Sequence, residues 1–356
     1  MHHNARNEDA SYPTYGALDL GTNNCRLLVA RPSRRGFLVV DAFSRIIRLG
    51  EGIGSNGALS QPAMDRTVDA LQVCADKLIR RQVKRCRLVA TEACRAAANG
   101  EEFIERVQSE TGLSLEILTR ESEARLAVCG CASLLDLSCD WALVFDIGGG
   151  SSELIWLNLA KLPRTPRRTL ADRLDAQECI SAWTSLPIGV VTLAERYDTV
   201  PMSPAVFEAM VQDVSAMLRD FERECDMGAA VAGGRVHMLG TSGTVTTVAG
   251  IHLGLKRYDR RRVDGSWLET TSVRRVSNEL VEMSHEERVA QPCIGMDRAD
   301  LVLAGCAILE AMLRVWPCER LRVADRGLRE GILATLMTED GIFKRSAQRD
   351  AGRPGQ

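Results

Sequence analysis

Two stretches decide the fold of this chain: Asp19-Leu20-Gly21-Thr22-Asn23-Asn24 and Asp146-Ile147-Gly148-Gly149-Gly150-Ser151-Ser152. Each follows an apolar run, over residues 15–20 and 141–145, and each precedes a second apolar run. Short apolar runs bounded by Gly, Asn and Asp are typical of strands joined by tight turns. Because the same pattern occurs twice, the sequence predicts an internal duplication into two α/β domains that face each other across a cleft.

Further strands and helices surround these two turns. Helices are predicted after the N-cap Ser60 and from Ser203-Pro204, where apolar residues recur at helical spacing, and also over residues 101–110 and from near residue 120. Residues 159–178 are rich in Arg, Lys, Asp and Pro and are predicted to form a loop. Short apolar runs predict strands over 25–30, 37–42, 87–90, 113–118, 153–157, 183–187 and 236–239.

Length and composition limit the class of protein. A chain of 356 residues, 45% hydrophobic and 26% charged, is expected to form about two soluble globular domains. Its net charge of −2 argues against a broad basic surface for nucleic acid or membrane. No apolar run approaches the roughly 18 residues of a transmembrane helix, and residues 1–13 lack the apolar core of a signal peptide.

The chain contains 12 cysteines. In a chain of this length they are not expected to form a small disulfide framework. Free cysteine behaves as a small buried hydrophobe, so we expect reduced core thiols in a cytoplasmic protein. The cysteines that stand in apolar segments are Cys74, Cys86, Cys94, Cys129 and Cys306.

Three loops combine glycines with hydroxyl or amide side chains, at residues 21–24, 148–152 and 240–244. Glycine lets the backbone approach an anion, and successive N–H groups then form an anion-binding concavity. Any one of the three could instead be a simple tight turn. Because all three follow apolar strands, together they favour phosphate binding.

Carboxylates stand beside two of these loops. Asp19 and Asp146 lie at the loop mouths, and Glu153 lies on the strand after the second loop. Carboxylate oxygens next to a bound phosphate suit Mg²⁺, which needs only one or two protein carboxylates. The alternatives are an aspartate that caps its own turn and an exposed strand glutamate.

Arg95 and Glu123 are candidates for phosphate contact and for acid–base chemistry. Arg95 follows a strand end, where a guanidinium can donate two hydrogen bonds to phosphate, although it could equally be a surface helix residue. Glu121 and Glu123 open a predicted helix, where the helix dipole favours acidic residues. A glutamate at this junction of the two halves could instead act as general base on a water molecule. The arginine-rich stretches 164–168 and 256–262 are solvated loops by default, with guidance of a polyanion as the alternative.

Six segments, in order along the chain, resemble the exopolyphosphatase / guanosine pentaphosphate phosphohydrolase (Ppx/GppA) family. Residues 19–27 are similar to its first phosphate loop, and Glu121-Ser122-Glu123-Ala124-Arg125-Leu126 is similar to its E-E-A-R-L segment. Residues 146–154 match its D-I-G-G-G-S-T-E-L loop, with Ser152 in place of Thr. Further matches lie at 185–189, 240–244 and 328–331, so the resemblance covers about residues 14–340. The glycine loops alone are shared with actin-like ATPases and sugar kinases, but with E-A-R-L and L-R-E-G they are specific to this family.

The resemblance implies an α/β fold of two RNase H-like domains, as in the actin-like ATPase and sugar kinase superfamily, around a central cleft. Domain I would comprise residues 14–121 and 324–343, and domain II residues 122–323, with flexible tails at 1–13 and 344–356. The last helix would return to pack on domain I. The implied activity is hydrolysis of a terminal phosphoanhydride, in polyphosphate or in the conversion of pppGpp to ppGpp. It would need Mg²⁺, or Mn²⁺ instead, and no organic cofactor, in a cytoplasmic homodimer that binds neither nucleic acid nor membrane.

The family's functional residues carry over by position. Glu123 matches the general base, and Asp146 and Glu153 match the metal and water-positioning carboxylates. Asp19 remains a third metal candidate because of its place at the first loop. The expected phosphate ligands are Thr22, Asn23, Arg95, Gly148, Gly149, Gly150, Ser151, Gly240 and Ser242.

Two departures from the family pattern and two alternative functions remain. Ser122 replaces the first Glu of E-E-A-R-L but leaves Glu123 in place. The sequence ends at residue 356, whereas long family members carry a further HD-type domain, so tight processive binding of very long polyphosphate is not expected. The alternatives are a kinase of the same superfamily and a non-catalytic alarmone or nucleotide sensor.

Overall fold

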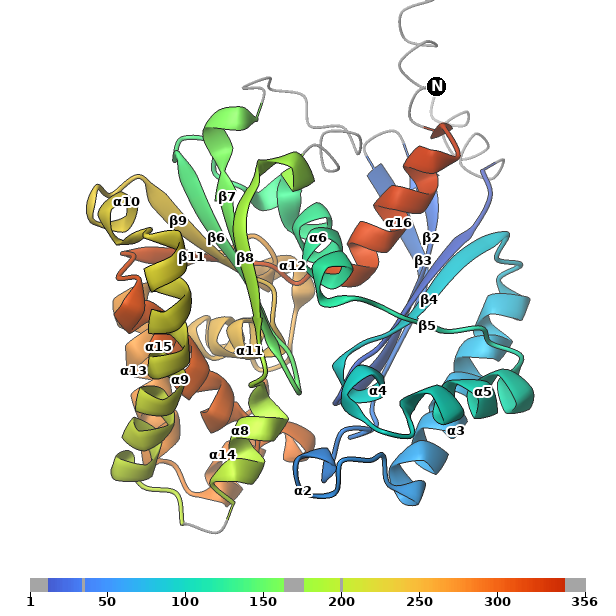
Figure 1. The fold of residues 1–356 in the computed structure, drawn as a ribbon, viewed down its shortest axis with the longest axis horizontal. Helices are drawn as coiled ribbons and strands as arrows, with labels where there is room; N and C mark the ends of the chain where they lie inside the picture. Colours follow the sequence, from blue (N-terminus) through green and yellow to red (C-terminus); the bar gives the residue numbers. More distant parts are fainter. Residues whose placement is uncertain (1–11, 34–35, 163–175, 199–200, 343–356) are drawn as a thin grey trace, which may run out of the picture. The chain divides into compact units, whose positions relative to one another are not determined.

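The computed structural model describes residues 12–33, 36–162, 176–198 and 201–342 (Figure 1). The chain divides into two compact units. The first contains Met1–Ser133, Arg164–Glu178 and Gly327–Gln356, and the second contains Leu134–Pro163 and Cys179–Arg326. The predicted domain boundary at residue 121 falls inside helix α6 (Arg120–Cys131), the whole of which belongs to the first unit.

The first unit is built on a five-stranded mixed sheet in the order β3-β2-β1-β4-β5. Strands β1, β2 and β3 form an antiparallel meander, whereas β4 and β5 run parallel to β1. The turn that follows β1 is the first of the two stretches that decided the fold. The strand bounds are β1 Tyr15–Leu20, β2 Asn24–Ser33, β3 Gly36–Ile46, β4 Arg85–Ala90 and β5 Glu116–Ile117.

The second unit repeats this arrangement. Its sheet has the order β10-β11-β9-β6-β7-β8, with β6, β7 and β8 antiparallel and with β9 and β11 parallel to β6. The shared topology confirms the predicted duplication and the α/β fold class. The strand bounds are β6 Trp141–Ile147, β7 Ser152–Asn158, β8 Ile180–Leu186, β9 Val236–Gly240, β10 Trp267–Glu269 and β11 Arg320–Val323.

Helices cover both faces of the first sheet. The face that carries Leu18 and Leu20 packs against α3 (Gln61–Arg80) and α5 (Gly100–Thr111). The opposite face packs against α6 and α16 (Leu328–Glu339), which lies across the sheet in Figure 1. The prediction that the last helix returns to the first domain is therefore confirmed. A short helix, α2 (Ile53–Asn56), precedes α3, and α4 (Glu92–Ala96) follows β4.

Glycines let α6 and α16 approach each other closely. A Cβ on Gly331 would lie 2.0 Å from the carbonyl oxygen of Leu126, and one on Gly130 would lie 1.8 Å from that of Gly327. No side chain fits at such distances, so both positions require glycine. This close packing fixes the N-terminal end of α6, which carries Glu123, relative to the first sheet.

The largest hydrophobic cluster of the second unit lies on one face of its sheet. Strand residues Phe145 and Trp156 pack there against the long helices α9 and α15. Ser203 caps α9 through its hydroxyl, as Ser60 caps α3, which confirms both predicted helix starts. The helix bounds are α8 Val190–Arg196, α9 Pro204–Cys225, α10 Gly228–Ala232, α11 Gly243–His252, α12 Arg260–Val263, α13 Thr270–Glu282, α14 His285–Ala290 and α15 Val302–Val315.

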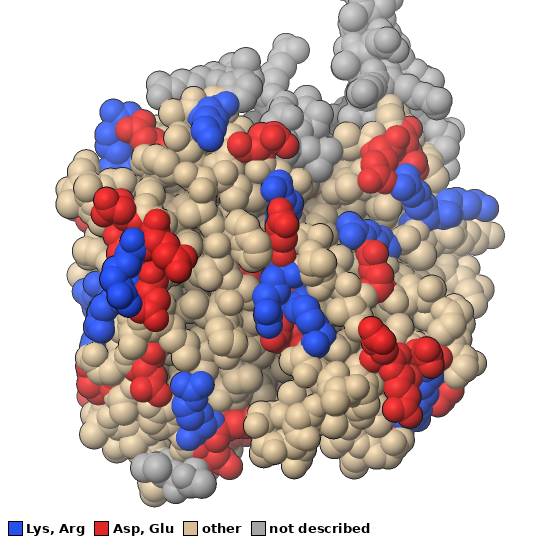
Figure 2. Space-filling view, viewed as in Figure 1, with Lys and Arg blue, Asp and Glu red and all other residues tan. Residues whose placement is uncertain are grey.

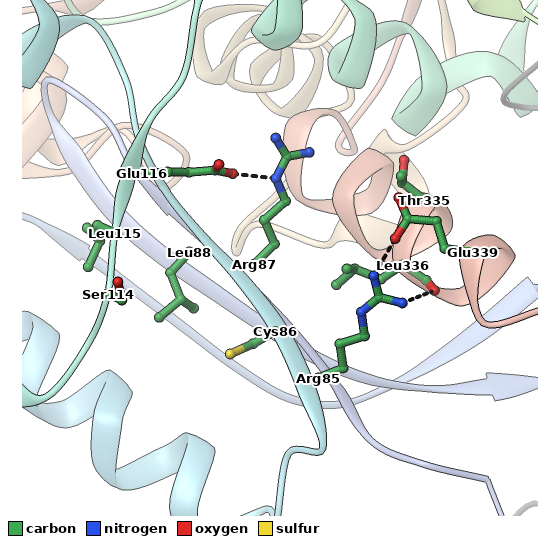
Figure 3. Close-up of a pocket in the computed structure, with 10 residues that line it drawn as sticks. All are labelled: Arg85, Cys86, Arg87, Leu88, Ser114, Leu115, Glu116, Thr335, Leu336 and Glu339. Atoms are coloured by element: carbon green, nitrogen blue, oxygen red, sulfur yellow. Dashed lines mark hydrogen bonds and ion pairs between the residues drawn. The ribbon is translucent and has the colours of Figure 1, made fainter.

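One cysteine departs from the sequence expectation. All 12 cysteines are free thiols, but Cys86 is exposed. Strand β5 pairs with β4 only at Val89 and Ala90, so the first half of β4 has an open edge. Cys86 lines a pocket at this edge, shown in Figure 3, together with Leu115 and Glu116. Cys86 stands in an apolar stretch of sequence but is exposed. The reason is that β5, the strand next to β4, is shorter than the strand predicted over residues 113–118.

The charged side chains on the face drawn in Figure 2 are of mixed sign, in agreement with the modest net charge. On the face drawn in Figure 2, Lys and Arg alternate with Asp and Glu and form no broad patch of one sign. Within the parts of the chain that the structure describes, no helix has both the length and the apolar character needed to cross a bilayer.

A charge cluster joins β3 to α3 and makes stability depend on pH. Asp41 accepts hydrogen bonds from Lys77 Nζ at 2.8 Å and from Arg81 Nε at 2.7 Å. These two cations lower the pKa of Asp41 to about 2. Because the pKa of Asp41 is lower in the folded chain than in the unfolded chain, its ion pairs stabilise the fold fully above the unfolded pKa of about 4. This stabilisation is lost as the pH falls toward 2.

We therefore expect Asp41→Asn to lower the free energy of unfolding at pH 7 by about 1–2 kcal/mol. The difference from wild type should shrink as the pH falls from about 4 toward 2, because the native carboxylate is then protonated. Urea unfolding at a series of pH values measures this. The exposed Asp76→Asn on α3 is the control, with an expected change below about 0.5 kcal/mol. A pH-independent difference would contradict the role of the charge.

Candidate active site

The first turn lies between β1 and β2 and is closed by backbone hydrogen bonds. The N–H of Gly21 donates to the carbonyl of Asn24 at 2.9 Å, and the Thr22 carbonyl accepts from the N–H of Gly50 at 2.9 Å. Thr22 and Asn23 are both buried. Asn23 Oδ1 is buried and has no hydrogen-bond partner among the described residues. A carboxamide can turn either its oxygen or its NH₂ toward a ligand, so the Asn23 side chain can form a further hydrogen bond.

Asp19 lies at the end of β1 on the face that α6 and α16 cover. Arg26 stands directly opposite it on β2. Burial raises the pKa of Asp19, while the charges of Arg26 and Arg329 act in the opposite direction and Glu330 adds to the rise. Glu330 is itself buried and accepts a hydrogen bond from the backbone N–H of Gly327. Asp19 thus has two arginines and a second carboxylate, Glu330, near it within the first unit.

Arg95 and Glu123, which are 28 residues apart, are in direct contact. Both terminal nitrogens of Arg95 donate to Glu123 Oε2 at 3.2 Å. Arg95 also donates to the Leu118 carbonyl at 2.6 Å and to Glu92. Burial opposes the charge of Arg95, but Glu123 and Glu92 outweigh it, so the pKa of Arg95 is raised. The two candidates from the first half of the chain therefore form one charged cluster.

The second turn follows β6 and is fixed by hydrogen bonds within the turn and from the start of α8. The N–H of Gly148 donates to the Ser151 carbonyl at 2.9 Å, and the carbonyls of Gly148 and Gly149 accept from the N–H groups of Val190 and Val191. A Cβ on Gly189 would lie 2.5 Å from the carbonyl oxygen of Gly149. Glycine at 189 therefore allows the start of α8 to press against the turn. Sequence reasoning gave Gly189 no role, although it belongs to a segment that matches the family.

Two carboxylates meet beside this turn. Asp146 on β6 stands directly opposite Glu153 on β7, so both side chains lie on the same face of the sheet, away from the α9–α15 core. Glu153 is only 3% exposed, which removes the alternative of an exposed strand glutamate. Its Oε1 accepts hydrogen bonds from Ser151 Oγ at 2.7 Å and from Ser185 Oγ at 2.9 Å. Ser185 was not among the predicted site residues, although the sequence match at 185–189 pointed to it.

The third loop links β9 to α11 in the same unit. Strand β9 lies next to β6, and the N–H of Thr241 donates to the Phe145 carbonyl at 2.9 Å. Gly240 is required because a Cβ there would lie 2.6 Å from the Phe145 ring. Ser242 caps α11 through its hydroxyl, which accepts from the N–H of Val245 at 3.1 Å. The structure therefore brings Gly240 and Ser242 to the edge of the sheet where β6 ends.

Other predicted features fall outside this arrangement. The arginine-rich stretch 164–168 lies outside the described residues. In the stretch 256–262, Tyr258 donates to Asp325 Oδ2 at 2.7 Å, and Arg260 forms an ion pair with the same side chain. These contacts support a structural role within the second unit. Over the described ranges, no group of three or more His, Cys, Asp or Glu side chains is placed to hold a metal ion by itself.

Comparisons with known proteins agree with this geometry. The model of the Ppx/GppA phosphatase family matches residues 28–340. The guanosine-5'-triphosphate,3'-diphosphate pyrophosphatase of Photobacterium profundum is 27% identical over 332 residues, which are 92% of this chain and 60% of that protein. The protein of the same name from Aliivibrio fischeri is 27% identical over 329 residues, with the same coverage of 92% and 60%. This chain thus spans about three fifths of the length of these relatives.

Solved structures give the same result for the fold. The crystal structure of the Aquifex aeolicus member of the Ppx/GppA family is 26% identical, with a TM-score of 0.69 over 92% of this chain and 98% of that one. An exopolyphosphatase-like protein is 27% identical, with a TM-score of 0.77 over 92% of this chain and 99% of that one. These similarities extend over both units.

Proposed function

Because this chain belongs to the Ppx/GppA phosphatase family, we propose that it hydrolyses a terminal phosphoanhydride and releases orthophosphate. The observation that carries the proposal is the pair of facing carboxylates, Asp146 and Glu153, beside a glycine turn at the end of a strand. A polyanion terminus would bind there through backbone N–H groups. The candidate substrates are inorganic polyphosphate and pppGpp, and two relatives carry a name that refers to the second.

The phosphate would bind mainly to the second unit. The turn of Gly148, Gly149, Gly150 and Ser151 offers N–H groups without a Cβ in the way, and Gly240 and Ser242 lie at the same end of the sheet. From the first unit, Thr22 and Asn23 are the proposed ligands, through the Thr22 hydroxyl and the Asn23 NH₂, which can donate to phosphate oxygens. Binding of a chain end by backbone groups needs no broad basic surface, in agreement with a net charge of −2.

The residues fit a divalent cation. Two carboxylates directly opposite each other repel, and a cation between them would remove that cost. Asp146 and Glu153, with the hydroxyls of Ser151 and Ser185 holding Glu153, match the small number of oxygen ligands that Mg²⁺ takes from proteins. Bound Mg²⁺ or Mn²⁺ would supply neutralisation of charge on the phosphoryl oxygens. Asp19 belongs to the first unit, and its role as a metal ligand stays a prediction.

Glu123 is the proposed general base. It would accept a proton from water as the water oxygen bonds to the terminal phosphorus, while the bond to the bridging oxygen breaks and the shortened anhydride leaves. The contact with Arg95 supports this role, because two hydrogen bonds from the guanidinium fix the position of the carboxylate. The Arg95 guanidinium donates to oxygens of Glu92, Leu118 and Glu123, so its predicted contact with phosphate would require exchange of those partners.

The test is phosphate release by the purified chain from polyphosphate and from pppGpp, each with and without Mg²⁺. We expect Mg²⁺-dependent release from at least one substrate without any added acceptor. Phosphate transfer only in the presence of an acceptor would favour the kinase alternative. Tight binding of pppGpp without turnover would favour the sensor. A homodimer in the cytoplasm, which the family resemblance implies, stays a prediction.

A further inference from the structure

Glu92 is a buried glutamate that sequence reasoning left without a role. It opens the five-residue helix α4, directly after β4, and is 8% exposed. Buried carboxylates are rare unless they are paired, and this one is paired twice. Its Oε2 accepts from Arg95 Nε at 3.0 Å and Nη2 at 2.5 Å, and its Oε1 accepts from Arg120 Nη2 at 3.0 Å.

These bonds complete the hydrogen bonding of Arg95. A guanidinium has five N–H donors in a rigid plane. In this structure two bonds go to Glu92, two to Glu123 and one to the Leu118 carbonyl. Because the plane is rigid, the pair of bonds to Glu92 sets the direction in which the remaining N–H groups point. Those groups reach Glu123, so the orientation of Arg95 toward Glu123 depends on Glu92.

Arg120 holds Glu92 from the other side. Arg120 and Glu123 are both in the first turn of α6, whereas Glu92 and Arg95 are both in α4. The four side chains therefore form a row of alternating charge, Arg120–Glu92–Arg95–Glu123, that joins the two helices. Glu92 is the inner anion of this row, and it shares the single charge of Arg95 with Glu123.

We propose that Glu92 is a positioning residue, which fixes the Arg95 guanidinium and through it the Glu123 carboxylate. The catalytic consequence rests on the proposed function, in which Glu123 is the general base. Without Glu92, a half-buried guanidinium would have one carboxylate left to satisfy, and Arg95 would turn more of its donors onto Glu123. The carboxylate would then be misplaced for proton transfer from water.

The first test compares Glu92→Gln with wild type in phosphate release. We expect kcat to fall about 10-fold with KM changed less than about twofold, because both carboxylate oxygens of Glu92 accept hydrogen bonds from Arg95 and Arg120. Glu121→Gln is the matched control: this glutamate stands in the same first turn of α6 and pairs with Arg125, outside the row. It should stay within about twofold of wild type. If Glu92→Gln does not fold, Glu92→Asp, whose shorter side chain reaches one arginine at a time, should show a smaller fall in kcat.

A double-mutant cycle separates positioning from general stability. If Glu92 acts through Arg95, Glu92→Gln should have no further effect on kcat in an Arg95→Ala background. Added guanidinium ion should partly restore the activity of Arg95→Ala, since a cation site between two carboxylates remains, and should not restore the double variant. Equal fold-losses from Glu92→Gln in both backgrounds, or equal rescue of both variants, would overturn the proposal.

A readout that does not need activity distinguishes this proposal from the proposed function. The Nε–H signal of Arg95 in a ¹⁵N-arginine NMR spectrum, assigned with Arg95→Lys, should exchange slowly with water in wild type and in Glu121→Gln. It should exchange at least about 10-fold faster in Glu92→Gln. Unchanged exchange would overturn the positioning role even if the enzyme is active. Slow exchange that depends on Glu92, with no phosphate release by the wild type, would support the contact and overturn the proposed function instead.

Discussion

Replacement of Glu123 by Gln is expected to lower the rate of phosphate release by about 1,000-fold, within the range of 10²–10⁴ for general acid–base catalysis. The amide keeps the size of the side chain and can still accept a hydrogen bond from Arg95, but it cannot accept the proton of water. KM should change little, because the phosphate is held elsewhere. The measurement is the initial rate of orthophosphate release at saturating substrate and Mg²⁺.

The control for this prediction is chosen from the same helix turn. Glu121→Gln removes an equivalent charge from the N-terminal turn of α6, where its side chain is 53% exposed and pairs with Arg125. If the helix dipole alone explains acidic residues here, both variants should lose stability slightly and neither should lose activity. A Glu123→Gln enzyme within about threefold of wild type would show that Glu123 is not the base.

Replacement of Glu153 by Gln is expected to lower phosphate release by about 100-fold and to raise the Mg²⁺ concentration needed for half-maximal activity. The amide still accepts from Ser151 and Ser185, whose hydroxyls hold Oε1 at 2.7 and 2.9 Å. The substitution removes the negative charge that lies opposite Asp146. Activity measured across a Mg²⁺ titration gives both quantities.

Thermal unfolding gives an independent measurement of the same site. In EDTA, Glu153→Gln should be at least as stable as wild type, because one of two facing carboxylates has lost its charge. Added Mg²⁺ should raise the Tm of wild type more than that of the variant, since a ligand stabilises only the state that binds it. Glu269→Gln, an exposed strand glutamate of the same sheet, should behave like wild type. Equal responses of wild type and Glu153→Gln to Mg²⁺ would contradict the assignment.

Much of the fold could be predicted because its signals are local. Strand β1 has the predicted bounds Tyr15–Leu20, and helices begin directly after Ser60 and Ser203 as predicted. A short apolar run, a turn glycine or a capping hydroxyl acts within a few residues of chain. The prediction for 113–118 was wrong in extent, because β5 contains only Glu116 and Ile117. Its length depends on what β4 offers as a partner, and that is not local.

The sequence by itself determined the repeated strand–turn–strand pattern, the three glycine loops and the identity of the carboxylates near them. Only the tertiary structure decided which side chains meet. Register places Glu153 opposite Asp146 and beside Ser185, and helix packing brings Glu92 and Arg95 of α4 to Glu123 of α6. These contacts join residues 7 to 32 positions apart through sheet pairing and helix packing. Their partners are chosen by burial and by the need to pair buried charge, and neither can be read from a short stretch of sequence.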